Sequence, residues 1–97
     1  MVKHIILWTL KDEFKTEEIK SDIKSGLEGL KGKIEGLIDI KVVTEKLESS
    51  NADLMLDSTF VDEQSLKNYA VHPAHVEVAD TKVRPFTATR SCLDFEI

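Results

Sequence analysis

The chain has 97 residues, of which 41% are hydrophobic and 32% are charged, and we predict one small globular domain over residues 1–97. Thirteen Lys and Arg are outnumbered by eighteen Asp and Glu, so the formal net charge is −5 at pH 7. Such a balance repels phosphate backbones, and we expect no nucleic-acid partner. A domain of this size buries a modest fraction of its surface, which favours association with a second copy.

The cysteine content and the first apolar run indicate the compartment. Cys92 is the single cysteine, so the chain forms no internal disulfide, which is typical of a reducing environment. The apolar run over 5–8 is far too short to cross a membrane, and no signal-peptide cleavage site follows it. We therefore predict a cytoplasmic protein without a membrane partner.

A first strand is predicted over residues 2–10, where β-branched and aromatic residues dominate. Alternation puts His4, Ile6 and Trp8 on one face, and we expect that face to lie in the interior between two sheets. The other face carries Ile5 and Leu7. Because both faces are apolar in the middle, both should be covered.

A helix is predicted over residues 17–34, with Thr16 as its N-cap and apolar residues recurring every three or four positions. Gly26, Gly29, Gly32 and Gly36 fall within it or at its end. Two interpretations stay open. The glycines either weaken the final turn before a stop at Gly36, or form a small-residue stripe that permits close approach of a neighbouring element.

The second half of the chain alternates strands and a bent helix. Strands are predicted over 38–47 and 53–60, joined as an antiparallel hairpin, with a final strand over 87–97. Helices are predicted over 63–71 and 74–82, meeting at a bend before Pro73.

The element order is strand, helix, strand, strand, bent helix, strand, and it predicts a ferredoxin-like split βαββαβ fold of the α+β class. Helices then cover only one face of the sheet. We expect a second copy to cover the other face, giving a homodimeric α/β barrel.

Histidine and tyrosine gather around the predicted bend. For His75, a general acid or base facing a cavity and a histidine that merely packs at the helix start are equally compatible with the spacing. His72 precedes proline, so its main expected role is to fix the turn, with a ligand contact as the alternative. Tyr69 either packs against the sheet or donates a hydrogen bond to a substrate carbonyl. His4 and the nearby Trp8 are candidates to line a ligand cavity, and a structural role for His4 is the alternative.

Other chemistries find little support. A metal held by His72 and His75 is disfavoured because Pro73 bends the spacing, and we expect neither a metal nor a cofactor. Cys92 is interpreted as a small core residue. No serine stands in a nucleophile elbow, and no fingerprint supports a haem- or flavin-assisted oxygenase.

The opening residues 2–8 and the block Tyr-Ala-Val-His-Pro-Ala-His-Val over 69–76 resemble the stress-responsive A/B barrel (Dabb) family. The strand over 52–56, Phe60 and the last strand also fit, so the resemblance covers essentially the whole chain. It implies a ferredoxin-like subunit that dimerises into a barrel.

The resemblance also implies a chemistry. Plant members close a linear polyketide by aldol chemistry without a redox cofactor, using the tyrosine and the second histidine of the block. These fall on Tyr69 and His75, and the strand histidine falls on His4. Such members carry a further histidine where this chain has Leu54, so the polyketide substrate does not carry over directly.

The function predicted from these observations is a cavity for a small apolar or aromatic ligand, with His75 as general base and Tyr69 polarising a carbonyl in a cyclase-like or lyase-like proton transfer. The alternative is a stress-related structural or binding protein without catalytic activity.

Overall fold

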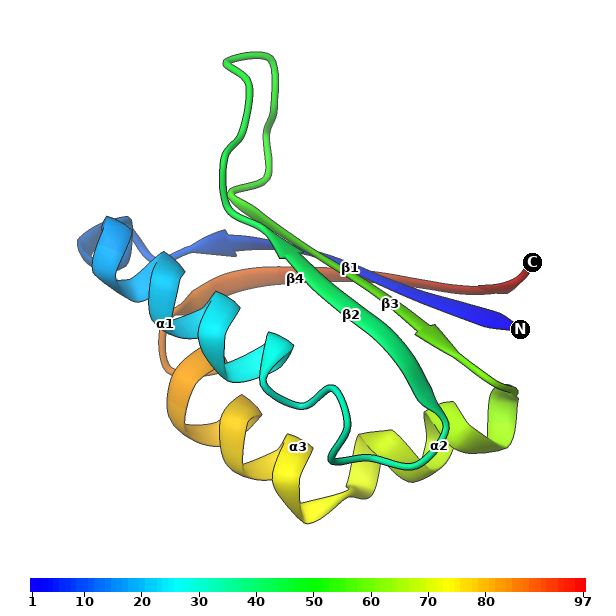
Figure 1. The fold of residues 1–97 in the computed structure, drawn as a ribbon. Helices are drawn as coiled ribbons and strands as arrows, with labels where there is room; N and C mark the ends of the chain where they lie inside the picture. The colour runs from blue at the N-terminus through cyan, green and yellow to red at the C-terminus, as the bar shows by residue number, and fades with distance from the viewer.

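The computed structural model describes residues 1–97, which form one four-stranded sheet with helices on one side (Figure 1). The elements are β1 (Val2–Leu10), η1 (Asp12–Phe14), α1 (Glu17–Glu28), β2 (Leu37–Val43), β3 (Leu54–Phe60), α2 (Glu63–Val71), α3 (Pro73–Val78), η2 (Ala79–Val83) and β4 (Thr87–Glu96). The strand order is β2-β3-β1-β4, and every neighbouring pair is antiparallel. The predicted split βαββαβ order is confirmed.

The hydrophobic core lies between the sheet and the helices. From β1 it takes alternate residues, including Ile6 and Trp8, and from α1 it takes Ile23 and Leu27. This corrects one expectation, because the face of β1 that carries His4 points at the helices and not at a second sheet. The alternation along β1 was right; the assignment of its two faces was reversed.

The first helix is shorter than predicted. It begins after the Thr16 cap, whose side-chain oxygen accepts a hydrogen bond from the Ile19 N–H, but it ends at Glu28 instead of 34. Turns follow, with Gly32 and Gly36 at φ of +85° and +87°, a region that L-residues rarely adopt. An added Cβ at Gly36 would lie 2.3 Å from the Oγ of Ser65, so this glycine also lets the loop approach α2.

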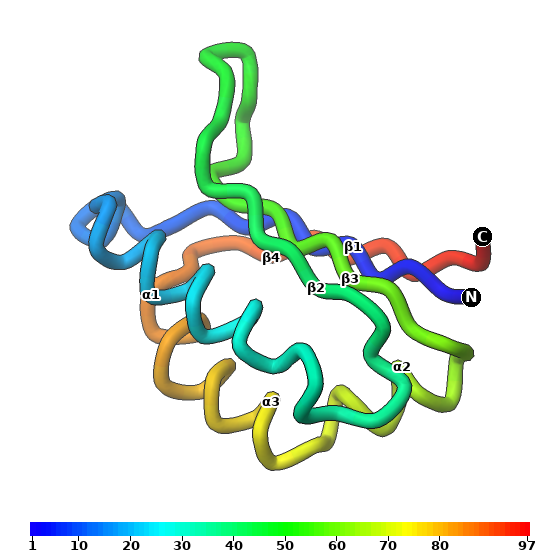
Figure 2. The backbone as a smooth tube through the Cα atoms, viewed as in Figure 1, coloured from blue at the N-terminus to red at the C-terminus, as the bar shows by residue number.

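The second strand ends at Val43 instead of 47, and the following connection to β3 projects from the sheet on the side away from the helices (Figures 1 and 2). Buried Asp53 anchors the base of this loop. Its carboxylate accepts hydrogen bonds from the Leu10 N–H and from Lys46 Nζ, each at 2.8 Å. The tip is solvent-exposed and includes Leu47.

The bent helix forms as predicted, with small shifts in its bounds. Asp62 caps α2 by accepting a hydrogen bond from the Ser65 N–H at 2.8 Å. The Nδ1 atom of His72 then accepts a hydrogen bond from the Ala74 N–H at the start of α3. The predicted 74–82 helix is α3 followed by the π-helical turn η2.

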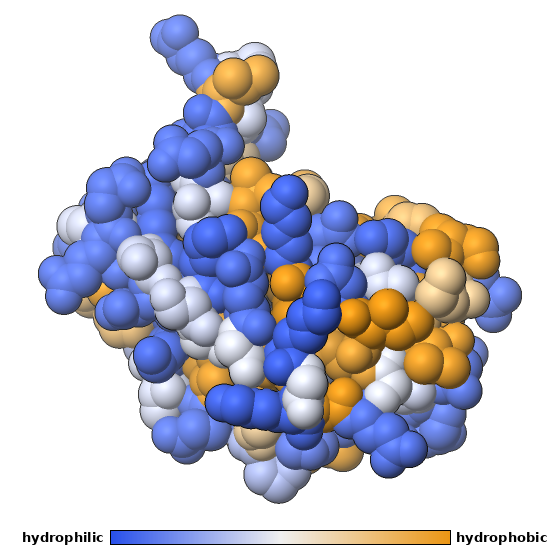
Figure 3. Space-filling model, in the orientation of Figure 1, coloured by the Kyte–Doolittle hydropathy of each residue, from blue (hydrophilic) through white to orange (hydrophobic).

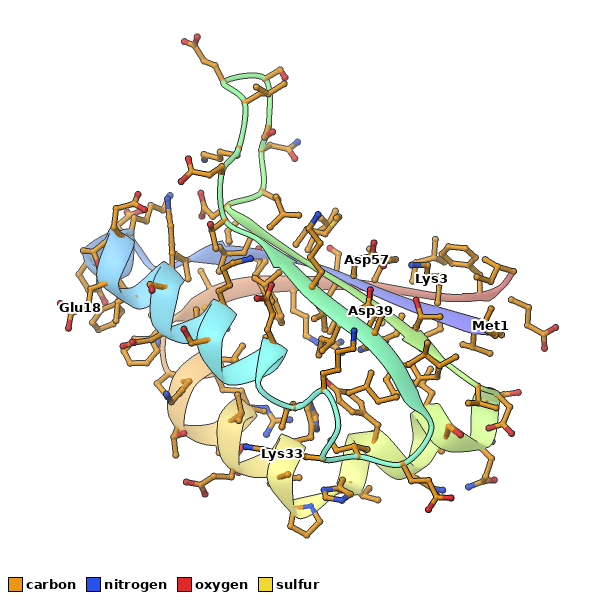
Figure 4. The ribbon with its side chains drawn as sticks, viewed as in Figure 1. Met1, Lys3, Glu18, Lys33, Asp39 and Asp57 are labelled. Atoms are coloured by element: carbon orange, nitrogen blue, oxygen red, sulfur yellow. The ribbon has the colours of Figure 1, made fainter.

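The sheet face away from the helices is open and partly apolar. Leu7 and Leu93 are 43% and 64% exposed on it, beside the ion pair between Lys3 and Asp57, whose side chains project from this face (Figure 4). Further exposed apolar residues gather at the end of the sheet where the termini lie (Figure 3). None of the helices has the length and hydropathy needed to cross a lipid bilayer.

Candidate functional site

A cavity of about 790 Å³ lies between the helix-facing side of the sheet and the bent helix. Its size falls within the range of small-molecule sites, and twelve of its twenty-one lining residues are hydrophobic. The lining side chains that carry hydrogen-bonding or titratable groups include His4 on β1, Tyr69 on α2, His75 on α3, and Arg90, Cys92 and Asp94 on β4. The sequence-predicted candidates His4, Trp8, Tyr69 and His75 all line this one cavity.

His4 is held in the sheet next to the last strand. It is 7% exposed, and its Nδ1 atom lies 2.5 Å from Oδ1 of Asp94, which is the residue directly opposite on β4. Its ring meets the rings of Phe60 and Tyr69 edge-on, with centroids 6.3 and 6.2 Å away. The carboxylate of Asp94 and the aromatic neighbours therefore fix the orientation of the imidazole.

Tyr69 lines the cavity and carries a buried hydroxyl that has no partner within the chain. The residue is 1% exposed, and the hydroxyl oxygen has no hydrogen-bond partner within the chain. Burial raises the pKa of the phenol, so the group stays protonated at neutral pH and is a donor. A buried hydroxyl without a partner costs free energy, and a ligand acceptor in the cavity would relieve that cost.

His75 stacks beside Tyr69, with ring centroids 4.2 Å apart and planes inclined by 35°. Its Nδ1 lies 3.2 Å from the carbonyl oxygen of Ala70. Because a carbonyl only accepts hydrogen bonds, Nδ1 carries the proton and the Nε2 lone pair of the neutral ring is free. Burial lowers the pKa of His75 below its ordinary value, the hydrogen bond to Ala70 opposes the shift, and the charges of Arg84 and Arg90 reinforce it. His75 is therefore a neutral base at pH 7.

Two residues considered from the sequence lie elsewhere. His72 is not among the lining residues; it caps α3 and borders a separate small hollow next to Ile34 and Asn68. Leu54, at the position where the resemblance implied a histidine in cyclase-type members, is buried beside Trp8 and does not line the cavity either.

The contribution of β4 was missed from the sequence. Cys92 was expected in the core, but it is solvent-exposed at the cavity, 3.7 Å from Nδ1 of His4. Arg90 lies opposite Trp8 on the same face. The alternation of the last strand does separate these residues from Ser91 and Leu93, which do not line the cavity, and that was the available signal. Only the pairing with β1 shows which set meets the cavity.

The comparisons with known proteins identify the family and the fold of this chain. The family model described as "Stress responsive A/B Barrel Domain" matches residues 2–97. Olivetolic acid cyclase of Cannabis sativa is 32% identical over 82 residues, which is 81% of this chain and 80% of that protein.

Solved structures share the same fold. A dimeric ferredoxin-like protein of unknown function from Bacteroides fragilis is 30% identical, with 99% of this chain and 95% of that chain covered and a TM-score of 0.89. The hydroxynitrile lyase of Passiflora edulis is 18% identical, with 99% and 92% covered and a TM-score of 0.84, a likeness of fold. The chain belongs to the stress responsive A/B barrel domain family.

Proposed function

We propose that this protein binds a small, largely apolar or aromatic carbonyl compound in the cavity and catalyses proton transfer at the carbon next to the carbonyl. The observation that carries this proposal is the pairing of Tyr69 and His75. A buried donor without a partner stands beside a neutral imidazole whose Nε2 is free, and both residues line a cavity of ligand size.

His75 is the general base in the proposed step. Its Nε2 takes a proton from the α-carbon of the ligand, and the electron pair of that C–H bond moves into the carbonyl group to give an enolate. The hydrogen bond from Nδ1 to Ala70 orients the ring and stabilises the imidazolium that forms. Return of the proton to carbon completes the exchange cycle. In a cyclisation, the enolate carbon attacks a second carbonyl of the same ligand, and the imidazolium gives its proton to the alkoxide that forms, which regenerates the neutral base.

Tyr69 stabilises the developing oxyanion. Its O–H donates to the carbonyl oxygen, where the negative charge gathers, and burial strengthens this interaction because water does not compete. His4 and Trp8 contact the ligand from the sheet. The step moves a proton and no net electrons, so it needs no redox cofactor.

This proposal is consistent with the names of two similar proteins, olivetolic acid cyclase and hydroxynitrile lyase. The buried Leu54 argues against the substrate of the cyclase-type members, because those members have a histidine at this position and leucine offers no equivalent group. We therefore propose an enolisable ketone as the ligand class without extending the proposal to a polyketide.

We also propose that the protein is a homodimer in which a second copy covers the open face of the sheet. That face carries exposed Leu7 and Leu93, and the loop that ends at Asp53 projects on the same side (Figure 1). The Bacteroides fragilis relative is dimeric. A face-to-face pair of sheets would give the barrel that the family description names.

The direct test is deuterium exchange at the α-carbon of aromatic methyl ketones in D₂O, followed by proton NMR. The wild-type protein should accelerate exchange over buffer, and His75→Ala should lower that rate by about 100- to 10,000-fold. Tyr69→Phe should lower it by about 100- to 1,000-fold, as removal of an oxyanion donor does.

Glu77→Gln is the matched control, because Glu77 is an exposed residue on the same helix and does not line the cavity. It should exchange at the wild-type rate. If His75→Ala exchanges as fast as the wild-type protein while remaining folded, the proposed base is wrong and the non-catalytic alternative gains.

A further inference from the structure

Three metal-binding side chains meet at one corner of the cavity. The Nδ1 atom of His4 lies 2.5 Å from Oδ1 of Asp94, and Sγ of Cys92 lies 3.7 Å from the same nitrogen and 3.5 Å from the same oxygen. All three donor atoms fall within 4.8 Å of one another. They are an imidazole nitrogen, a thiol sulfur and a carboxylate oxygen, each of a type that Zn²⁺ takes as a ligand.

Strand pairing holds these groups together despite 88 positions between His4 and Cys92. His4 lies opposite Asp94 and Ile6 lies opposite Cys92 in the ladder between β1 and β4. Cys92 and Asp94 are two apart on one strand, so they share a face with His4. The placement is therefore a property of the sheet backbone and not of a mobile loop.

Two of the three observed separations are close to those of a tetrahedral zinc centre. Zn–S bonds of about 2.3 Å and Zn–N and Zn–O bonds of about 2.0 Å place sulfur about 3.5 Å from the other donors, and nitrogen and oxygen about 3.3 Å from each other. The two sulfur distances already agree with these values. The contact between His4 and Asp94 must widen, and Asp94 has freedom to move because its side chain is 45% exposed.

We propose that His4, Cys92 and Asp94 form a binding site for a thiophilic divalent cation, with Zn²⁺ as the best match. Three protein ligands leave a fourth position open to the cavity, which is the pattern of a reactive or ligand-accepting zinc and not of a closed structural one. Tyr69, whose buried hydroxyl has no partner, lines the same cavity, and its ring centroid lies 6.2 Å from that of His4.

The thiol of Cys92 has no part in the proposed proton transfer at His75 and Tyr69. A bound divalent cation would displace the thiol proton and pair with the thiolate. This inference goes beyond the proposed function, because neither His75 nor Tyr69 supplies a zinc ligand.

The test is a titration of the full chain with Zn²⁺ against a competing chromophoric chelator at neutral pH. One saturable site per chain is expected. Cys92→Ser and Asp94→Asn should each weaken affinity by about 100-fold or more, since loss of even an outer partner of a zinc ligand costs about 10- to 100-fold. With Co²⁺, the wild-type protein should show a near-ultraviolet thiolate-to-cobalt band that Cys92→Ser removes.

Two variants serve as controls. Asp57→Asn removes a carboxylate from the opposite face of the sheet, and His75→Ala removes the proposed base; both should keep wild-type zinc affinity. Cys92→Ala provides a second thiol deletion, and the melting temperature of each variant checks its folding. Absence of saturable binding, or wild-type affinity in folded Cys92→Ser, would overturn the site without affecting the exchange test of His75.

Discussion

At the scale of single residues, the buried hydroxyl of Tyr69 allows a ligand-binding role to be distinguished from a structural role by mutation. A tyrosine kept for packing would hydrogen-bond within the chain, but this one has no partner. Tyr69→Phe deletes only that hydroxyl, so the free energy of unfolding should change by no more than about 0.5 kcal/mol. Chemical denaturation measures it. A loss above about 1 kcal/mol would show that the hydroxyl stabilises the fold after all.

His75 gives a pH signature. Burial lowers its pKa in the folded state below the ordinary 6.5. At pH values below 6.5 the unfolded chain therefore binds a proton that the native protein does not, and the contribution of His75 to stability declines as the pH falls, until the folded group also protonates. The acid limb of kcat/KM for exchange should accordingly lie below pH 6.5.

The matched variant isolates this contribution. His75→Gln should lose less stability than the wild-type protein between pH 7.5 and 5.5, measured by denaturant unfolding at each pH. Equal pH dependence in the two proteins would mean that the pKa of His75 is the same in the folded and unfolded states.

The site could be predicted from sequence only where neighbours in the chain are neighbours in space. Tyr69 and His75 share one bent helix, so their joint role was visible in the block that contains them. Cys92 was misplaced in the core because its proximity to His4 depends on the pairing of the first and last strands. His72 was separated from the cavity by the bend at Pro73, whose direction no local pattern specifies.

At the scale of elements, the two positive-φ glycines are not equivalent. Alanine at either position incurs the left-handed backbone cost, but a Cβ at Gly32 meets open space, while one at Gly36 collides with Ser65. Gly36→Ala should therefore destabilise the protein more than Gly32→Ala, which should cost about 1 kcal/mol. The difference between their free energies of unfolding is the measurement, and Ser65→Gly should reduce it. Equal losses would contradict the close approach to α2.

The strands were predicted well because alternation along the chain matches burial along β1 and β3. The helix predicted over 17–34 extends beyond the end of α1 at Glu28. Leu30 and Ile34 are buried and continue the apolar spacing, although the backbone there forms turns. The spacing of buried residues shows which side chains face the core. It does not show where the helix ends, because the glycines in this segment favour turns over helix.

At the scale of the whole molecule, the open sheet face predicts the oligomeric state. Leu93→Asp should convert a dimer to a monomer in sedimentation velocity, because it places a charge in the proposed interface. Val71→Asp is the control, since Val71 is 76% exposed at the end of α2, among the helices. It should stay dimeric. A monomeric wild-type protein would contradict the proposal that a second copy covers the open face. The sequence alone predicted that one face of the sheet is covered by a second copy, but it did not show which face.

In the proposed function one base, His75, acts from one side of the cavity on an enolisable ligand. The most direct measurement is the stereochemistry of deuterium uptake into an aromatic ketone with a prochiral α-CH₂ group, read by NMR. A single positioned base predicts that the protein exchanges one of the two α-protons and leaves the other at the buffer rate. Equal exchange of both protons, or no acceleration of either, would show that His75 does not act as a single base from one side of the ligand.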